Sequence, residues 1–356
     1  MNNRPTPTEL NSIEDLARLV AAGETDWSQY GDVKTVVHDD LILFDYTDKA
    51  TFANRWNWFE RVSRGLVLNR FTGEVVARPF GKFFNYGEGG RLPTGHIVEV
   101  SEKLDGSLGI LYRHQGRYHI CTRGSFTSDQ AVWATTWLNA HYKLDGLPDH
   151  LTLLFEIVYP ENRVVVNYGE RAELVLIGAR NRFTDYDFPF FPVVSGLANR
   201  YGFATPDTFP TTHVENLLAA AKSLDANHEG WVIRFSDDSR WKIKGDRYQE
   251  IHRLISQASY RRVLEAVQGG SYEQWIASIP DEFLADVRRW RDDIHRRIET
   301  VLLRINAAFD DAPKSSRKEF ALWVNAHHPK LAPYLFARLD NKDPLPLIYK
   351  IEFQND

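Results

Sequence analysis

The sequence IVEVSEKLDGSLGILYR at residues 97–113 places a lysine where one predicted strand ends and before the next begins. The apolar run Ile97–Val100 precedes Lys103, and a second run follows at Leu108–Tyr112. Gly106 permits a tight turn and lets a ligand approach the backbone closely. A lysine that leaves a strand just before Asp-Gly is well placed to act as a nucleophile. The alternative is an ordinary hairpin with a surface lysine.

Further charged residues lie on predicted strands elsewhere in the chain. Glu156 lies inside a strongly apolar strand, and Glu229 opens another. Lys242 and Lys244 are two residues apart, so a strand directs both side chains to one face. Two adjacent cations repel each other unless an anion such as a polyphosphate lies between them. The alternatives are a structural acid at Glu156 and a solvated strand face for the two lysines.

Apolar runs bounded by turn sequences predict mixed α and β structure over the first two thirds of the chain. The predicted strands are Leu41–Tyr46, Gly65–Leu68, Glu74–Pro79, His96–Ser101, Leu108–Arg113, Tyr118–Thr122, Leu151–Val158, Leu174–Arg180, Gly230–Phe235 and Arg240–Lys244. Helices are predicted at residues 8–22 and at Asp129–Leu144.

The strand signal largely disappears after residue 247, where we place a boundary between domains 1–247 and 248–356. The predicted helices of the second domain are Tyr248–Val267, Asp281–Phe309 and Ser315–His327. In the longest of these, apolar residues recur at steps of three and four, which is the spacing of one helix face. They are Phe283, Val287, Trp290, Ile294, Ile298, Val301 and Ile305.

Charges on the longest predicted helix are balanced. Arginines and acids are equally numerous between residues 281 and 304. Asp292 and Arg296 are spaced for an ion pair along a helix, and so are Asp293 and Arg297. This pattern favours a solvated, salt-bridged face over an RNA-binding patch.

Composition limits the class of protein. The 356 residues are enough for two domains with buried cores. Hydrophobic residues make up 43% and charged residues 26%, which argues against a largely disordered chain. The net charge of -5 excludes a uniformly basic nucleic-acid coat but leaves room for a local basic cleft. The one cysteine, Cys121, excludes an internal disulfide and a thiolate-built zinc site.

Targeting signals and several common motifs are missing from the sequence. Met1 to Glu14 is polar, and no uncharged apolar run approaches the roughly 18 residues that a membrane helix needs. We therefore expect a cytoplasmic protein without a membrane partner. A P-loop does not occur, and Asp105 stands where the esterase nucleophile motif needs glycine.

The lysine motif, Glu156, Glu229 and the lysine pair, in this order, resemble the covalent nucleotidyltransferase superfamily of ATP-dependent ligases and mRNA capping enzymes. Three further segments are similar to the phage-type single-stranded RNA ligases, which repair broken tRNA. These segments are Ser63-Arg64-Gly65-Leu66-Val67, the run from Arg78 to Asn85, and Thr122-Arg123-Gly124-Ser125-Phe126. The resemblance covers roughly residues 40–247. A helical second domain fits these ligases better than the small β-barrel that usually follows in DNA ligases and capping enzymes.

The resemblance implies an α+β nucleotidyltransferase (adenylation) domain with antiparallel sheets and flanking helices, followed by an all-helical domain that helps to choose the RNA. ATP would be the nucleotide substrate, with Mg²⁺ or Mn²⁺ as the metal. Lys103 would attack the α-phosphate, and AMP would then move to the 5′-phosphate of an RNA end. A 3′-hydroxyl would finally displace AMP and seal the RNA.

The same resemblance implies the site residues. Catalytic roles fall to Lys103, Asp105, Glu229, Lys242 and Lys244, and metal binding falls to Glu229. Nucleotide binding falls to Arg64, Lys82, Phe84, Glu102, Lys103, Gly106, Arg123, Glu156, Ile177, Val232, Lys242 and Lys244. Glu156 would contact the ribose, and Ile177 and Val232 would pack against adenine. Attack requires a neutral amine, so we expect nearby cations and a bound metal to lower the pKa of Lys103 from the ~10.4 of free lysine.

RNA with 3′-hydroxyl and 5′-phosphate ends is the expected partner, with broken tRNA as a candidate substrate and an end-healing kinase-phosphatase as a candidate partner. One alternative is another nucleotidyltransferase of the superfamily, either a DNA-end ligase or a capping guanylyltransferase. The other is a non-catalytic RNA-binding module on the same fold, against which the intact Lys103, Glu229, Lys242 and Lys244 argue.

Overall fold

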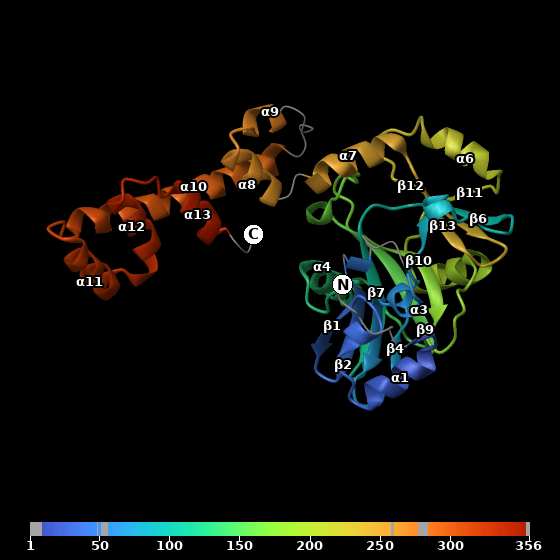
Figure 1. Cartoon of the computed structure of the whole chain (residues 1–356). Helices are drawn as coiled ribbons and strands as arrows, with labels where there is room; N and C mark the ends of the chain where they lie inside the picture. Colours follow the sequence, from blue (N-terminus) through green and yellow to red (C-terminus); the bar gives the residue numbers. More distant parts are fainter. Residues whose placement is uncertain (1–8, 48, 51–55, 258–259, 277–283, 354–356) are drawn as a thin grey trace. The chain divides into compact units, whose positions relative to one another are not determined.

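The computed structural model describes residues 9–47, 49–50, 56–257, 260–276 and 284–353. The chain forms two compact units, Met1–Gln249 and Glu250–Asp356 (Figure 1). All the described strands belong to the first unit, and the described elements of the second unit are helical. The predicted α+β class with a helical C-terminal region is therefore confirmed. The boundary predicted after residue 247 lies close to the division between the units.

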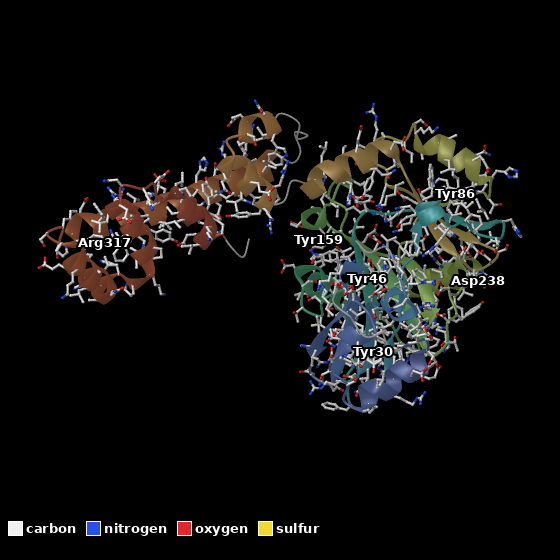
Figure 2. All side chains as sticks on the ribbon, in the orientation of Figure 1. Tyr30, Tyr46, Tyr86, Tyr159, Asp238 and Arg317 are labelled. Atoms are coloured by element: carbon white, nitrogen blue, oxygen red, sulfur yellow. The ribbon has the colours of Figure 1, made fainter. Side chains whose placement is uncertain are left out.

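The first sheet of the first unit is antiparallel and has the order β1-β2-β3-β4. Its strands are β1 (Val33–His38), β2 (Leu41–Tyr46), β3 (Arg64–Asn69) and β4 (Val75–Ala77). All residues of β2 are buried, because Phe44 packs with Tyr30 in one core and Leu43 packs with Ile110 in another. Figure 2 labels Tyr30 among the side chains of the first of these cores. Burial on both faces explains the apolar run Leu41–Phe44 of this strand.

The second sheet is also antiparallel and has the order β10-β9-β7-β8. Its strands are β7 (Ser107–His114), β8 (Arg117–Cys121), β9 (Leu151–Val158) and β10 (Glu173–Asn181). Phe155 of β9 lies in the core that also contains Leu138 of helix α4 (Asp129–His141), whereas Leu154 lies in the core of the opposite face. Glu156 interrupts this buried run and remains only partly covered.

The third sheet has the order β11-β6-β12-β13-β5, and only β13 and β5 pair in parallel. Its strands are β5 (Phe84–Asn85), β6 (Ile97–Glu102), β11 (Thr208–Phe209), β12 (Gly230–Phe235) and β13 (Arg240–Lys244). Trp231, Ile233 and Ile243 pack with Leu217 of helix α6 (Val214–Ala221). This apolar packing occupies one face of the sheet and leaves the charged residues of β12 and β13 on the other.

Short helices complete the first unit, and three begin at a side-chain cap. The α-helices besides α4 and α6 are α1 (Ile13–Ala21), α3 (Trp58–Val62), α5 (Ser195–Tyr201) and α7 (Asp246–Gln257), the last of which crosses into the second unit. The other turns are η1 (Trp27–Gln29), η2 (Glu88–Gly90), η3 (Pro160–Asn162) and η4 (Phe190–Val194). Ser12, Asn57 and Ser128 cap α1, α3 and α4 by accepting a backbone hydrogen bond.

The second unit packs its helices around an aliphatic stripe on the longest of them. The elements are α8 (Tyr260–Gln268), α9 (Tyr272–Ile276), α10 (Leu284–Asp311), α11 (Arg317–His327), η6 (Pro329–Leu331), α12 (Ala332–Leu339) and α13 (Leu345–Glu352). Ile294, Ile298, Val301 and Ile305 of α10 are buried, as their spacing predicts. Asp292 pairs with Arg291, and Asp293 with Arg296. None of the helices in the described ranges is both long and apolar enough to cross a membrane.

The structure differs from the sequence-based expectations mainly at short elements. Strands β1, β5 and β11 and helices α3, α5, α6, α9, α12 and α13 were not expected. The helix expected over Tyr248–Val267 consists of the separate helices α7 and α8. Residues 281–283, the predicted start of the long helix, lie outside the described residues.

Replacing Gly230 by alanine should destabilise the first unit, because this residue opens β12 at a φ of +133°. An added Cβ would lie 2.0 Å from the carbonyl oxygen of Ile243 on the neighbouring strand. Backbone strain and overpacking together should lower the free energy of unfolding by about 3 kcal/mol, measured by urea unfolding followed by circular dichroism.

Gly116→Ala is the matched control for this change. Gly116 also has a positive φ, of +79°, but an added Cβ would meet nothing within 4 Å. Only the backbone cost of about 1 kcal/mol should remain. Equal losses for the two variants would show that the close approach of β13 does not limit position 230.

Candidate active site

Strand register arranges the predicted lysines on one face of the third sheet. Lys103 directly follows β6, and its backbone N–H donates to the carbonyl oxygen of Gly230 at 2.8 Å. Side chains two residues apart share a face, so Lys242 and Lys244 lie together, as predicted. Successive rows on this face are the Lys103 row (Lys103, Gly230, Lys244), the Ser101 row (Ser101, Val232, Lys242) and the Glu99 row (Glu99, Arg234, Arg240).

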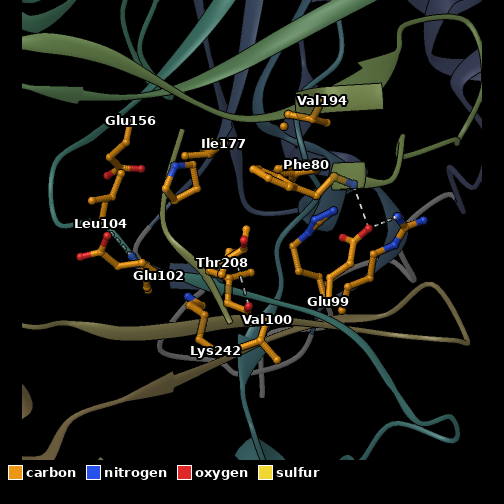
Figure 3. Close-up of a pocket in the computed structure, with 18 of the residues that line it drawn as sticks. Phe80, Glu99, Val100, Glu102, Leu104, Glu156, Ile177, Val194, Thr208 and Lys242 are labelled. Carbon is orange, nitrogen blue, oxygen red and sulfur yellow. Dashed lines mark hydrogen bonds and ion pairs between the residues drawn. The ribbon is translucent and has the colours of Figure 1, made fainter. Parts of the chain in front are cut away.

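A cavity of about 350 Å³ lies against these rows (Figure 3). The predicted residues that line it are Arg64, Glu102, Lys103, Gly106, Glu156, Ile177, Val232, Lys242 and Lys244. Figure 3 shows Glu102 and Glu156 at one end of the cavity and Phe80 and Glu99 at the other. The end near Lys103 therefore carries Glu102 and Glu156, and the other end combines the ring of Phe80 with the carboxylate of Glu99.

Glu229 lies between two lysine amines. Its Oε2 is 2.8 Å from Nζ of Lys103, and its Oε1 is 2.8 Å from Nζ of Lys244. The carboxylate side chain is only 2% exposed, against 19% for Lys103 and 20% for Lys244. Glu229 therefore supports the cavity lining by holding the two amines that do reach it.

Glu156 reaches the same lysine from the second sheet. Its Oε1 accepts a hydrogen bond of 2.9 Å from the backbone N–H of Gly106, which fixes the carboxyl beside the lysine loop. A Cβ at Gly106 would lie 2.5 Å from the carbonyl oxygen of Ile157, so the loop can approach β9 this closely only with glycine. Burial raises the pKa of Glu156 to about 7, although the charge of Lys103 opposes the rise.

The two central lysines have pKa values displaced in opposite directions. Burial alone would lower the pKa of Lys103, but the carboxylates of Glu229 and Glu156 outweigh it and raise that pKa above its ordinary value. Among this chain's own groups, the two carboxylates therefore outweigh the neighbouring cations, contrary to expectation, and the effect of a bound metal on the pKa of Lys103 stays a prediction. It is Lys242 whose pKa falls, to about 6, through burial and the nearby charges of Lys82 and Lys103.

Asp105 does not line the cavity, although it lies only two residues from Lys103. Its Oδ2 accepts hydrogen bonds from the backbone N–H groups of Val165 at 2.7 Å and Val166 at 2.8 Å. Its Oδ1 accepts from the hydroxyl of Tyr248 at 2.7 Å. This buried carboxylate anchors the loop that carries Lys103 to two other segments of the first unit.

Lys82, Phe84 and Arg123 also lie outside the cavity lining. Nζ of Lys82 is 5.6 Å from the ring centroid of Tyr46 and equally far from that of Phe84, at cation–π distance. Arg123 donates to the Tyr46 hydroxyl at 2.9 Å and pairs with Asp45 at 3.1 Å. Lys82 and Arg123 thus place two further cations around Tyr46, outside the cavity lining.

Several residues of this region were not predicted from the sequence. Asp45 and Tyr46 end a fully buried strand, and a buried acid in an apolar strand is the signal that also marked Glu156. Tyr248 carries no such signal, because an aromatic residue at the start of a helix is usually part of a core. Glu99 and Arg234 alternate with apolar residues, as on any strand with one solvated face.

Comparison with known proteins gives a family match over the segment that contains these residues. A family model described as RNA ligase matches residues 62–249, which is more than half of the chain. A protein of Autographa californica nuclear polyhedrosis virus, provisionally named bifunctional polynucleotide kinase/RNA ligase, is 27% identical over 274 residues, covering 66% of this chain and 38% of that protein.

Two further relatives carry the name RNA ligase. The protein of Thermovibrio ammonificans, so named provisionally, is 30% identical over 237 residues, covering 62% of this chain and 60% of its own length. The RNA ligase of Rhodothermus phage RM378 is 23% identical over 387 residues, covering 85% of this chain and 86% of that protein. This chain therefore spans well under two thirds of the viral relative and about three fifths of the Thermovibrio one. On the match of the family model, the chain belongs to the RNA ligase family.

Proposed function

We propose that this protein is an ATP-dependent RNA ligase that joins a 3′-hydroxyl to a 5′-phosphate through lysyl-AMP and RNA-adenylate intermediates. The observation that carries the proposal is the position of Lys103. Its amine lies at the charged end of a cavity that Lys242, Lys244 and Arg64 also line, in a chain of the RNA ligase family. A single amine surrounded by further cations suits a nucleophile that attacks a polyphosphate.

In the first step, the ammonium of Lys103 must release a proton to solvent before the amine attacks the α-phosphorus of ATP. The new P–N bond forms as the bond to the pyrophosphate oxygen breaks, and pyrophosphate carries away the negative charge. Glu229 accepts a hydrogen bond from the ammonium form and so orients the amine. In the later steps the P–N bond is exchanged for a bond to the RNA 5′-phosphate, and a 3′-hydroxyl then displaces AMP.

The phosphate groups need cations that are not already neutralised by acids. Lys244 is paired with Glu229, whereas no carboxylate in the described part of the chain lies within ion-pair distance of Lys242. We assign Lys242 and Arg64 to direct contact with the triphosphate. The layer around Tyr46 contains Lys82, Phe84 and Arg123. We propose that the charges of Lys82 and Arg123 make the electrostatic potential in the cavity more positive.

A divalent metal, Mg²⁺ or Mn²⁺, is part of the proposal. The described residues contain no group of three or more histidine, cysteine or acidic side chains arranged for a metal ion. Mg²⁺ is commonly held by one or two carboxylates together with substrate phosphates. Glu156, which lines the cavity, fits such an ion once ATP is bound, and Glu229 would join it only after releasing Lys103 or Lys244. When bound, the metal would stabilise negative charge on the phosphates.

The nucleoside would occupy the middle of the cavity. Ile177 and Val232 line it and would contact the two faces of adenine, while Glu156 would accept from a ribose hydroxyl. Glu102, at the end of β6, would border the sugar. Asp105 lies behind the loop, so we propose that it positions Lys103 through its backbone bonds and does not touch the nucleotide.

The RNA and its preparation are the least determined parts of the proposal. Residues 1–247 would adenylate Lys103, and residues 248–356 would help to select the RNA, with cytoplasmic broken tRNA as the candidate. The name of the viral relative pairs a polynucleotide kinase with an RNA ligase. We propose that a kinase-phosphatase similarly prepares the 3′-hydroxyl and 5′-phosphate ends for this protein.

Lys103→Ala should abolish the covalent adenylyl adduct that forms when the protein is incubated with ATP and Mg²⁺. Intact-mass spectrometry and peptide mapping measure the adduct, and ligation of RNA and of DNA ends with matched sequences tests the substrate. Lys103→Arg keeps a cation beside Glu229 but offers no neutral amine, so this variant should also form no adenylyl adduct.

Lys143→Ala, which removes an exposed lysine of the same unit, should label as well as the parent. Chelation of the metal should stop labelling of all variants. Labelling of Lys103→Ala at the parent level would refute the assignment of the nucleophile, and adduct formation only from GTP would point to a guanylyltransferase.

The rate of adduct formation should rise with pH between roughly pH 8 and 10. This range lies above the pKa of Glu156 and below the raised pKa of Lys103, so the neutral fraction of Lys103 increases throughout it. The rise should approach tenfold per pH unit in single-turnover measurements.

Glu229→Gln removes the carboxylate that contributes most to raising the pKa of Lys103. The pH profile should therefore move to lower pH, whatever the loss in maximal rate. Glu74→Gln, a change of the same kind outside the cavity, should leave the profile in place. A profile that does not move in Glu229→Gln would mean that another step limits the rate.

A further inference from the structure

The Glu99 row lies one step farther along the sheet than the row that contains Val232. Two residues along a strand advance by about 7 Å, which is close to the width of a purine base. Glu99, Arg234 and Arg240 all line the cavity. A base that rests on Val232 with its sugar toward Lys103 would therefore direct its outer edge at the Glu99 row.

Glu99 is held in place by one carboxylate oxygen and keeps the other available. Its Oε1 accepts a hydrogen bond of 2.8 Å from the backbone N–H of Phe190 and lies 3.5 Å from Nη1 of Arg234. In the described ranges, no hydrogen bond to Oε2 is present. The side chain is 24% exposed and borders the cavity, so a ligand can reach that oxygen.

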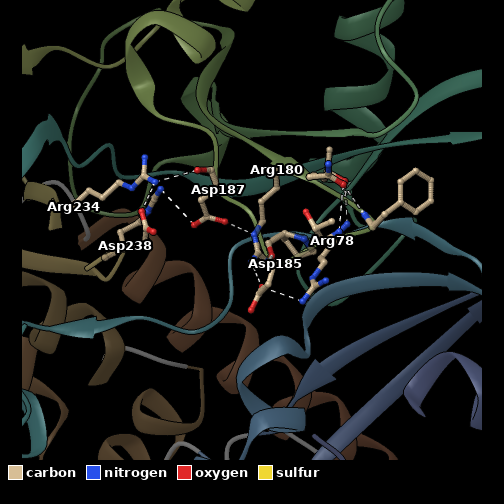
Figure 4. A network of polar contacts seen from close by, with 12 residues as sticks. Arg78, Arg180, Asp185, Asp187, Arg234 and Asp238 are labelled. Carbon is tan, nitrogen blue, oxygen red and sulfur yellow. Dashed lines mark hydrogen bonds and ion pairs between the residues drawn. The ribbon is translucent and has the colours of Figure 1, made fainter. Parts of the chain in front are cut away.

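Acids outside the cavity lining contact both arginines of this row, and Figure 4 shows Arg234 beside Asp187 and Asp238. Nη2 of Arg234 donates to Oδ1 of Asp238 at 2.7 Å and to the carbonyl oxygen of Asp187 at 3.1 Å. Arg240 lies 3.6 Å from the Asp187 carboxylate. These acids compete with any ligand for the guanidinium groups, whereas in the described ranges no hydrogen bond occupies Oε2 of Glu99.

Phe80 and the Arg240 guanidinium stacked on it form part of the wall at this end of the cavity. The guanidinium of Arg240 lies 3.9 Å from the ring centroid of Phe80. A Cβ at Gly178 would lie 2.3 Å from that ring, so glycine is what allows Phe80 to pack against β10. Phe80 and Gly178 both line the cavity, which favours an aromatic ligand at this position.

We infer that Glu99 reads position 6 of the purine, with its Oε2 accepting a hydrogen bond from the amino group of adenine and repelling the carbonyl oxygen of guanine. This inference rests on the proposed function, because it assumes that a nucleoside triphosphate occupies the cavity with its phosphates toward Lys103. It assigns nucleotide choice to a residue outside the lysine motifs.

The test compares adduct formation, measured by intact mass, from ATP, GTP and purine riboside triphosphate, which lacks the amino group. The parent should prefer ATP to purine riboside triphosphate by about ten- to a hundred-fold in kcat/KM, the worth of one hydrogen bond to a charged group. Glu99→Ala should use the two nucleotides equally. Glu99→Gln can donate to the guanine carbonyl, so its preference for ATP over GTP should fall at least tenfold.

Asp238→Asn is the matched control. It removes the acid that contacts Nη2 of Arg234 and leaves Glu99, which lies near Nη1, in place, so both nucleotide ratios should stay at the parent value. If the parent preference persists in Glu99→Ala and in Glu99→Gln, Glu99 does not contact the base and the inference is overturned. If the parent forms no adduct from any of the three nucleotides, the proposed function fails as well.

Should Glu99→Ala fail to fold, as judged by circular dichroism, Glu99→Gln carries the test alone, because it preserves the size of the side chain. An unchanged ATP-to-GTP ratio in that folded variant would overturn the assignment of Glu99. If Asp238→Asn lowers the ATP-to-GTP ratio as much as Glu99→Gln does, the assignment of Glu99 is also overturned. That result would assign the choice of nucleotide to Arg234.

Discussion

The antiparallel register of β6, β12 and β13 is the constraint on which the site depends. A shift of one residue would turn Lys242 and Lys244 into the core and bring Trp241 and Ile243 to the cavity. Such a shift is opposed by the apolar face, where Trp231, Ile233 and Ile243 pack with α6. The charged face is thus fixed by hydrophobic packing on the opposite side of the same sheet, and no charged contact is required to set the register.

Within that frame, the buried carboxylate of Glu229 divides the lysines into two kinds. Lys103 and Lys244 share its two oxygens, while Lys242 is left among cations with a depressed pKa. A buried charge is costly unless it is paired. An anion that enters the cavity would therefore stabilise the ammonium form of Lys242 far more than those of the two paired lysines. The free protein is therefore electrostatically arranged for a ligand that brings negative charge.

Sequence reasoning succeeded where local rules determine the result. The period of two along a strand was sufficient to place Lys242 and Lys244 on one face, and Glu156 was evident as a charge in an apolar strand. The sequence could not show that Asp105 lies outside the cavity lining. The position of this carboxylate depends on hydrogen bonds from Val165 and Val166, which are far along the chain. The strands β5 and β11, with two residues each, are too short to show a period at all.

The hydrogen bond between Asp105 and Tyr248 has a practical consequence for anyone who wishes to study the first unit alone. Tyr248 lies in the first turn of α7, which continues to Gln257. A protein truncated after Gln249 would keep this tyrosine on a fragment of only one helical turn, and so short a fragment is not stable by itself. Oδ1 of the buried Asp105 carboxylate would then lose the hydroxyl of Tyr248 as a fixed hydrogen-bond donor. Expression of the isolated unit should therefore extend through the whole of α7.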